Sequence, residues 1–264
     1  MCTEAPVVVT AEGAVRGVWR EQGSSRSAAF LGIPFAQPPT GPLLFAAPQP
    51  VPPWEGVRQA HKMGATPLRQ DCEDTAIPEP AIPGKSTLNV NVFTPSPTSD
   101  ASLPVLVWIH GGGYFAGSPA SPWYDGAAFN RDGVVTVSIS YRLGFIGFGW
   151  VEGAPQNRGV LDWLAALEWV RRDIAAFGGD PSQVTIGGQS AGGGAVQTLL
   201  GMEVAQPLFR RSLSISGVTA DIPERRARAF ARRVGKRLGV PPTQAALTAA
   251  GEAAVDAAAT QVTQ

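Results

Sequence analysis

The stretch that most constrains the fold of this chain is Val-Thr-Ile-Gly-Gly-Gln-Ser-Ala-Gly-Gly-Gly, at residues 184–194. Its first three residues are β-branched and predict a buried strand. The run after the glycines, residues 195–200, is compatible with a helix. The chain therefore has to turn sharply from strand to helix at Gly188-Gln-Ser-Ala-Gly192, which has the G-x-S-x-G spacing of a nucleophile elbow.

Glycine and serine have separate roles in such a turn. A serine at the apex, here Ser190, has strained backbone angles, and side chains on the flanking residues would collide with neighbouring elements. The turn lifts the hydroxyl above the sheet and directs the following N–H groups, at the start of a helix, to the place where negative charge develops. The alternative interpretation is a glycine-rich turn with an incidental serine, so the motif depends on its strand–turn–helix context.

A second motif, His110-Gly-Gly-Gly113, follows another apolar run. An acyl-transfer enzyme needs a nucleophile, a base, a group that orients the base, and N–H donors for the oxyanion. The two motifs predict the first and the last of these, with Ser190 as the nucleophile and the backbone N–H groups of Gly112, Gly113 and Ala191 as the oxyanion hole. The alternative for the second motif is a merely flexible turn, but the two motifs together favour acyl transfer.

The base is the missing component. The sequence has two histidines, His61 and His110, and both precede Ser190. In this arrangement the triad order is serine, then the acid, then histidine. We expect His110 to support its own loop by hydrogen bonds and His61 to be solvated, so the chain contains no complete triad.

The rest of the chain alternates strand-like and helix-like segments. Apolar residues at spacings of four and three predict a helix over about residues 160–177, with a buried stripe from Trp163 to Phe177. The strand–helix–strand order indicates a doubly wound α/β fold. We expect a single domain over residues 1–264, because no inter-domain linker is evident. The other expected elements are a hairpin in 6–19, a proline-rich wrap in 30–57, a loop in about 64–84 that rims a pocket, strands in 88–93, 105–109, 134–141, 184–186 and 213–216, a basic helix in 223–238, and a weakly amphipathic alanine-rich segment in 243–262.

Charge and cysteine content exclude several classes of protein. Basic and acidic residues balance at 21 each, which gives no case for a nucleic-acid or anionic membrane partner, and we interpret the basic helix as a solvated face. Cys2 and Cys72 make no disulfide framework and have no metal-ligand spacing. The N-terminus lacks a signal-peptide pattern, and no apolar run is long enough to span a membrane, so we expect a cytoplasmic protein.

Five ordered stretches resemble the type B carboxylesterases, the family of p-nitrobenzyl esterases and cholinesterases. The resemblance implies an α/β-hydrolase fold, a mostly parallel, doubly wound sheet with an N-terminal antiparallel hairpin. The relatives are longer, and their triad acid and histidine lie beyond the matched part, so we expect the sheet to stop before the family's last strands. The matching stretches are 30–41 with 54–57, 88–95, Trp108-Ile-His-Gly-Gly-Gly-Tyr114, 140–148, and Phe177-Gly-Gly-Asp-Pro-Ser-Gln-Val-Thr-Ile186 with the elbow that follows.

The resemblance also implies an activity. It implies a serine carboxylester hydrolase that forms an acyl-enzyme on Ser190, without a metal or cofactor. Gln189 stands where many relatives carry an acid, which argues against a cation-selective site and for neutral, moderately apolar esters as substrates. We expect Gln189, Tyr114 and Phe115 to line the substrate pocket.

Two further expectations concern partners and the rival hypothesis. A sheet that ends after residues 213–216 has an unpaired edge, which favours association. We therefore expect the chain to pair with a C-terminal half or with itself through that edge. The rival is a non-catalytic α/β-hydrolase-like binding protein, or an inactive fragment. The presence of both Ser190 and residues 111–113 disfavours a pure binding protein, because an adhesion surface needs neither.

Overall fold

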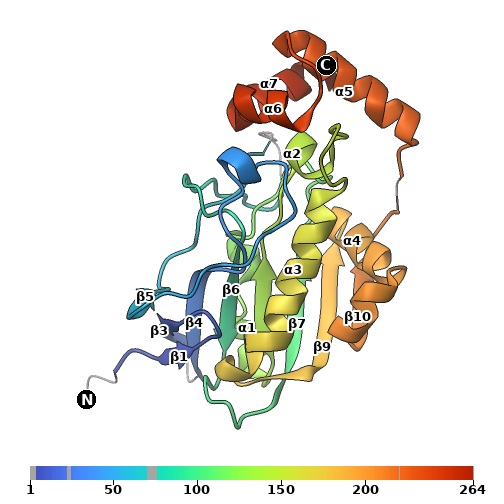
Figure 1. Cartoon of the computed structure of the whole chain (residues 1–264). Coiled ribbons are helices and arrows are strands. Elements are labelled where there is room, and N and C mark those ends of the chain that lie inside the picture. The colour runs from blue at the N-terminus through green and yellow to red at the C-terminus, as the bar shows by residue number, and fades with distance from the viewer. Residues whose placement is uncertain (1–3, 23–24, 70–75, 220, 264) are drawn as a thin grey trace.

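A seven-stranded sheet forms the centre of the molecule (Figure 1). The structure is a computed structural model that describes residues 4–22, 25–69, 76–219 and 221–263, so Cys2 and Cys72 lie outside the described residues. The strand order is β10-β9-β7-β8-β6-β4-β3. These strands are β3 Val18–Gln22, β4 Ser25–Pro34, β6 Asn89–Thr94, β7 Leu103–Ile109, β8 Val135–Ile139, β9 Gly179–Gln189 and β10 Arg211–Ile215.

Half of the pairings in this sheet are parallel. The pairs β8–β7, β7–β9 and β9–β10 are parallel, whereas β3–β4, β4–β6 and β6–β8 are antiparallel. The sheet is therefore mixed, which corrects the expectation of a mostly parallel sheet. Connection length explains the first antiparallel pair, because only two residues separate β3 from β4 and a parallel partner needs a crossover of about a dozen residues.

The predicted N-terminal hairpin is confirmed, but it lies outside the main sheet. Strands β1 (Val7–Val9) and β2 (Ala14–Arg16) pair antiparallel, and the backbone N–H groups of Thr10 and Gly13 donate to each other's carbonyls in the turn. β2 also pairs in parallel with β5 (Val57–Gln59), which follows the proline-rich wrap. The result is a separate three-stranded sheet.

Helices cover both faces of the main sheet. The predicted helix over 160–177 is confirmed as α3 (Arg158–Asp173), continued by the 3-10 turn η3 (Ile174–Phe177). Its apolar stripe is fully buried in the same core as alternate residues of β7, β8 and β9, and α4 (Ala191–Leu200) joins that core. On the other face, α1 (Ala127–Arg131) bonds to the strands, since the Asn130 amide donates to the Phe93 carbonyl at 3.0 Å. Successive side chains of a strand point to opposite faces of the sheet. Thr136 of β8 lies against Gly126 at the start of α1, whereas the next residue, Val137, belongs to the core on the other face. The fold is therefore doubly wound.

A second hydrophobic cluster lies beyond the ends of the parallel strands, under a cap of helices at the top of Figure 1. The predicted basic helix is confirmed as α5, and the alanine-rich segment forms two helices, α6 and α7. Their apolar faces pack on α2 and on the 3-10 turn η1. The expectation of a single domain over residues 1–264 stays a prediction. The remaining helical elements are η1 Gly41–Leu43, η2 Pro122–Tyr124, α2 Gly144–Phe148, η4 Glu203–Leu208, α5 Glu224–Leu238, α6 Gln244–Ala250 and α7 Glu252–Thr263.

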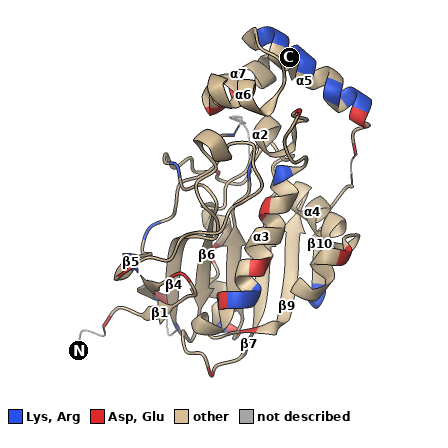
Figure 2. Ribbon diagram, in the orientation of Figure 1, with Lys and Arg blue, Asp and Glu red and all other residues tan. Residues whose placement is uncertain are grey.

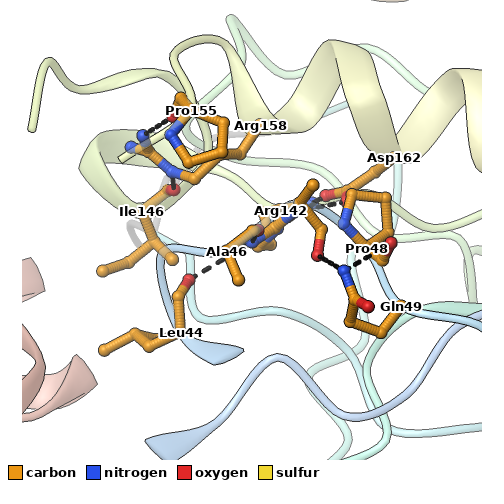
Figure 3. A network of polar contacts seen from close by, with 10 residues as sticks. Leu44, Ala46, Pro48, Gln49, Arg142, Ile146, Pro155, Arg158 and Asp162 are labelled. Carbon is orange, nitrogen blue, oxygen red and sulfur yellow. Dashed lines mark hydrogen bonds and ion pairs between the residues drawn. The ribbon is translucent and has the colours of Figure 1, made fainter. Parts of the chain in front are cut away.

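Two buried arginines connect the turn after η1, helix α2 and the start of α3 (Figure 3). Arg142 pairs with Asp162 of α3 at 2.7 Å and donates to the carbonyl of Ala46 at 2.7 Å. Arg158 donates to backbone carbonyls of Phe145, Ile146, Gly149 and Pro155. Burial, followed by the nearby Arg142 charge, lowers the pKa of Arg158 to about 9. These bonds fix the turn after η1, helix α2 and the start of α3 relative to one another.

The surface has two features that bear on partners. The basic residues of α5 are exposed, as expected, and their positions are coloured blue along the helix in Figure 2. All five residues of β10, the edge strand, are exposed as well.

Over the described ranges, no helix combines the length and the apolar composition needed to cross a bilayer. The cytoplasmic location stays a prediction.

Candidate active site

The predicted elbow lies where β9 meets α4. β9 ends at Gln189, α4 begins at Ala191, and Ser190 between them has φ 56° and ψ −121°. A non-glycine residue with positive φ is strained, and such strain persists only where the surroundings impose it. Here the Ser190 N–H donates to the Ile215 carbonyl at 2.9 Å, and the Ser190 carbonyl accepts from the Gly194 N–H at 2.9 Å. The turn is thus held both by β10 and by the first turn of the helix.

Close packing explains the glycines of the elbow. A Cβ on Gly192 would overlap the carbonyl oxygen of Ile109, the last residue of β7. A Cβ on Gly188 would in turn overlap the backbone of Gly192. The start of α4 can therefore lie directly against the end of β7 only without side chains at these positions, which is the reason that the sequence suggested.

The His110-Gly-Gly-Gly113 motif forms a tight turn immediately after β7. Gly112 has φ 108° and its carbonyl accepts from the N–H groups of Phe115 at 3.1 Å and Ala116 at 2.8 Å. A Cβ built on Gly111 would lie 3.4 Å from the Ser190 Cβ. β7 and β9 are parallel neighbours with Ile109 opposite Gly188, so the two motifs meet at the same edge of the sheet. We call residues 111–117 the glycine turn.

The three predicted pocket residues have different surroundings. Gln189 is half-buried, and its Oε1 would lie 3.2 Å from a Cβ on Gly111. Phe115 is 42% exposed, and its ring lies against Gly113. Tyr114, with φ 66°, packs into the core against Phe148 and Trp163, at ring distances of 5.0 and 6.0 Å. Only Gln189 and Phe115 are thus placed at the rim of the turn, and the pocket role of all three stays a prediction.

His110 is buried beneath the glycine turn. Its Nδ1 lies 2.8 Å from the Gly111 carbonyl oxygen, which can only accept, so Nδ1 carries the proton. The ring stacks on Tyr141 at 4.4 Å, and the Tyr141 hydroxyl donates to the His110 carbonyl at 2.8 Å. Burial lowers the pKa of His110 to about 4, so the imidazole is neutral at pH 7. These contacts agree with the supporting role expected of His110.

Tyr141 is a residue whose role the motif analysis missed. It follows β8, and the only local signal was its place in the Ser-Tyr-Arg stretch that resembles the family. The other histidine, His61, is exposed and forms a bridge with Leu31, next to β5. Among the hydrogen bonds of the described residues, none joins a histidine to Ser190. Within the described part of the chain, the site thus has a strained serine beside a glycine turn, and no histidine hydrogen-bonded to that serine.

Comparisons of the family pattern, of whole sequences and of solved structures all find esterases. The sequence pattern described as the carboxylesterase family matches residues 4–253. The para-nitrobenzyl esterase of Bacillus subtilis (strain 168) is 38% identical over 240 residues, which cover 89% of this chain and 48% of that protein. The liver carboxylesterase of Sus scrofa is 39% identical over 259 residues, covering 92% of this chain and 45% of that protein. The chain thus spans about half the length of the curated relatives it matches.

Solved structures extend the similarity to the fold. A carboxylesterase of Geobacillus stearothermophilus, solved at pH 6.8, superimposes with a TM-score of 0.84 at 34% identity, over 97% of this chain and 54% of that one. The juvenile hormone esterase of Manduca sexta, with OTFP covalently attached, gives a TM-score of 0.90 at 30% identity, over 97% and 51% of the two chains. The α/β-hydrolase fold expected from the sequence is confirmed.

Proposed function

The chain belongs to the carboxylesterase family, and we propose that it supplies the nucleophile-bearing part of a serine carboxylester hydrolase. One observation carries the proposal: a strained serine at the start of α4 lies directly beside the glycine turn that ends β7. A flexible glycine linker would need neither the close backbone contacts at Gly192 nor the approach of Gly111 to Ser190.

In the proposed reaction, the Ser190 hydroxyl oxygen bonds to the ester carbonyl carbon while its proton passes to a general base. The carbonyl oxygen becomes an oxyanion, which accepts hydrogen bonds from the N–H groups of Gly112, Gly113 and Ala191. Each such donor stabilises the transition state by ~3 kcal/mol. The alcohol then leaves with the proton, and water hydrolyses the acyl-enzyme. No step in this scheme uses a metal or a cofactor.

The proposed base comes from outside these 264 residues. A general base works best with a pKa near the operating pH, whereas burial holds the pKa of His110 at about 4 and its Nδ1 proton is committed to Gly111. His61 is exposed next to the three-stranded sheet. We therefore place the imidazole and its carboxylate partner on a further polypeptide segment.

Strand β10 is the proposed docking edge for that segment. All of its residues are exposed, including Leu213 at 46% and Ile215 at 41%. An exposed apolar edge strand favours pairing with another chain. Because the Ile215 carbonyl also accepts the Ser190 N–H, a partner on β10 lies close to the nucleophile. Pairing of two copies through the same edge is the alternative occupant.

Neutral, moderately apolar esters are the proposed substrates. The side chains placed at the rim of the glycine turn, Gln189 and Phe115, carry no charge that would hold an ionic substrate. This agrees with the relatives and structural neighbours, which include a para-nitrobenzyl esterase and a juvenile hormone esterase.

A biotinylated fluorophosphonate tests the role of Ser190. We expect it to modify Ser190 slowly in the chain alone, because the general-base contribution of about 10²–10⁴-fold is missing, and faster once a C-terminal half of a relative is added. Mass spectrometry locates the modified residue. Ser190→Ala should abolish modification. Ser182→Ala, at the exposed opposite end of β9, should leave it unchanged. Modification that persists in Ser190→Ala, or none even with the added half, would favour the non-catalytic binding protein.

A further inference from the structure

A buried carboxylate from a distant loop reaches the backbone of the glycine turn. Glu79 lies in the loop that we expected at the rim of a pocket. Its Oε2 accepts the Gly117 N–H at 2.9 Å and also pairs with the Arg69 guanidinium at 3.2 Å. Arg69 donates in addition to the Glu79 carbonyl at 2.6 Å. The Arg69 and Glu79 side chains are only 12% and 10% exposed.

We propose that Glu79, held in place by Arg69, is a positioning residue for the oxyanion hole. Glu79 holds Gly117, the last residue of the glycine turn, in place. Through Gly117 it also sets the positions of the backbone N–H groups of Gly112 and Gly113. The inference rests on the proposed function of Ser190, because it assigns a purpose to the turn's geometry. Neither Glu79 nor Arg69 touches Ser190 in any contact of the described residues, so neither is proposed as a catalytic residue.

Packing inside the turn makes the geometry of the turn depend on the position of Gly117. A Cβ on Gly117 would overlap the Gly111 carbonyl oxygen and the Nδ1 of His110. Gly117 thus lies against both the first residue of the turn and the ring beneath it. The Gly112 carbonyl accepts the N–H groups of Phe115 and Ala116. Because Gly117 follows Ala116 directly in the chain, a shift of Gly117 moves Ala116 and, through this hydrogen bond, Gly112.

The chemistry of the Glu79 contact suits a positioning role. A hydrogen bond from a backbone N–H to a carboxylate is shorter and stronger than one between neutral groups. Burial strengthens it further, and the Arg69 charge offsets the cost of burying the carboxylate. The Glu79 charge also acts on Tyr124. Burial, followed by the Glu79 charge, raises the pKa of Tyr124 to about 12.

The test compares Glu79→Ala with Glu79→Gln. Alanine removes the acceptor for the Gly117 N–H, whereas the glutamine carbonyl oxygen can still accept it. The matched control is Ser118→Ala, which removes the 2.7 Å bond from the Ser118 hydroxyl to the Pro80 carbonyl between the same two loops. Two quantities are measured on the folded chain: the rate of fluorophosphonate modification of Ser190, and the amide NMR signals of Gly112 and Gly113 after ¹⁵N-glycine labelling.

We expect Glu79→Ala to slow modification by about 10- to 100-fold, the range expected for a misplaced reacting group, and to shift the two amide signals. Glu79→Gln should recover most of the rate, and Ser118→Ala should lower the melting temperature without changing the rate. Unchanged amide signals in Glu79→Ala overturn the proposal. An equal loss of rate in Ser118→Ala also overturns it, because loop docking alone would then be the cause. If the wild-type chain is not modified even after the C-terminal half is added but the amides shift in Glu79→Ala, the positioning stands and the proposed function fails.

Discussion

The burial of His110 predicts a specific loss of stability when the pH falls from 7 to 5. The imidazole is fully buried under the glycine turn, and burial lowers its pKa from 6.5 to about 4. In the unfolded chain the same group titrates near its ordinary value of about 6.5. Between these two values the unfolded state binds more protons than the folded state, so the free energy of unfolding decreases as the pH falls.

The magnitude follows from the two pKa values. Linkage gives a loss of about 2 kcal/mol between pH 7 and pH 5, almost all of it below pH 6.5. With a urea m-value of about 2 kcal/mol/M, this lowers the unfolding midpoint by about 1 M. Carboxylates act in the opposite direction, because burial raises the pKa values of Glu252 and Asp256 and the folded state then gains protons as the pH falls.

A variant without the imidazole separates these effects. His110→Asn retains an amide N–H that can donate to the Gly111 carbonyl, as Nδ1 does in the wild type, but it does not titrate. Urea unfolding followed by tryptophan fluorescence, at pH 7 and pH 5, gives the change in stability of each protein. We expect the wild type to lose about 2 kcal/mol more than His110→Asn. His61→Asn, at the exposed histidine, should behave like the wild type. An equal loss in the wild type and His110→Asn would refute the argument from burial.

Two further predictions concern the buried Arg142–Asp162 pair and the sheet edge. Asp162→Asn leaves the buried Arg142 charge without its carboxylate and should cost about 3–5 kcal/mol in urea unfolding. Asp132→Asn, at an exposed pair with Arg131, should cost less than about 1 kcal/mol, and similar costs for the two changes would mean that burial does not make the Arg142–Asp162 pair important for stability. Ile215→Lys on β10 should shift the isolated chain toward monomer in sedimentation velocity, because a charge on an edge strand opposes pairing. A wild-type chain that is already monomeric would contradict the docking role of that edge.

Much of the fold was predictable because it depends on local patterns. The stripe from Trp163 to Phe177 has helical spacing, and those residues are buried in α3 and η3. The β-branched run before the elbow lies in β9, and Gly188 and Gly192 lie where a Cβ would meet the end of β7. Such patterns are legible in the sequence because one element's spacing decides which of its residues face the core.

Pairing and environment were decided only by the tertiary structure. The sequence indicated strands but not that three pairings of the main sheet are antiparallel, nor that the hairpin lies in a sheet with β5. Nor did it indicate that the half-buried ring of Tyr114 packs against Phe148 and Trp163, whereas the pocket role of Tyr114 stays a prediction. The contact between Glu79 and Gly117 had no sequence signal at all, because the two residues are 38 positions apart and come from separate loops.

The sequence by itself therefore determined the family, the fold and the identity of the candidate nucleophile, because motif spacing and side-chain periodicity are local properties. The tertiary structure alone determined the state of His110, whose lowered pKa comes from burial by β7, the glycine turn and Tyr141 together. A protonation state depends on every group packed around it, and those groups are brought together only when distant segments fold against one another.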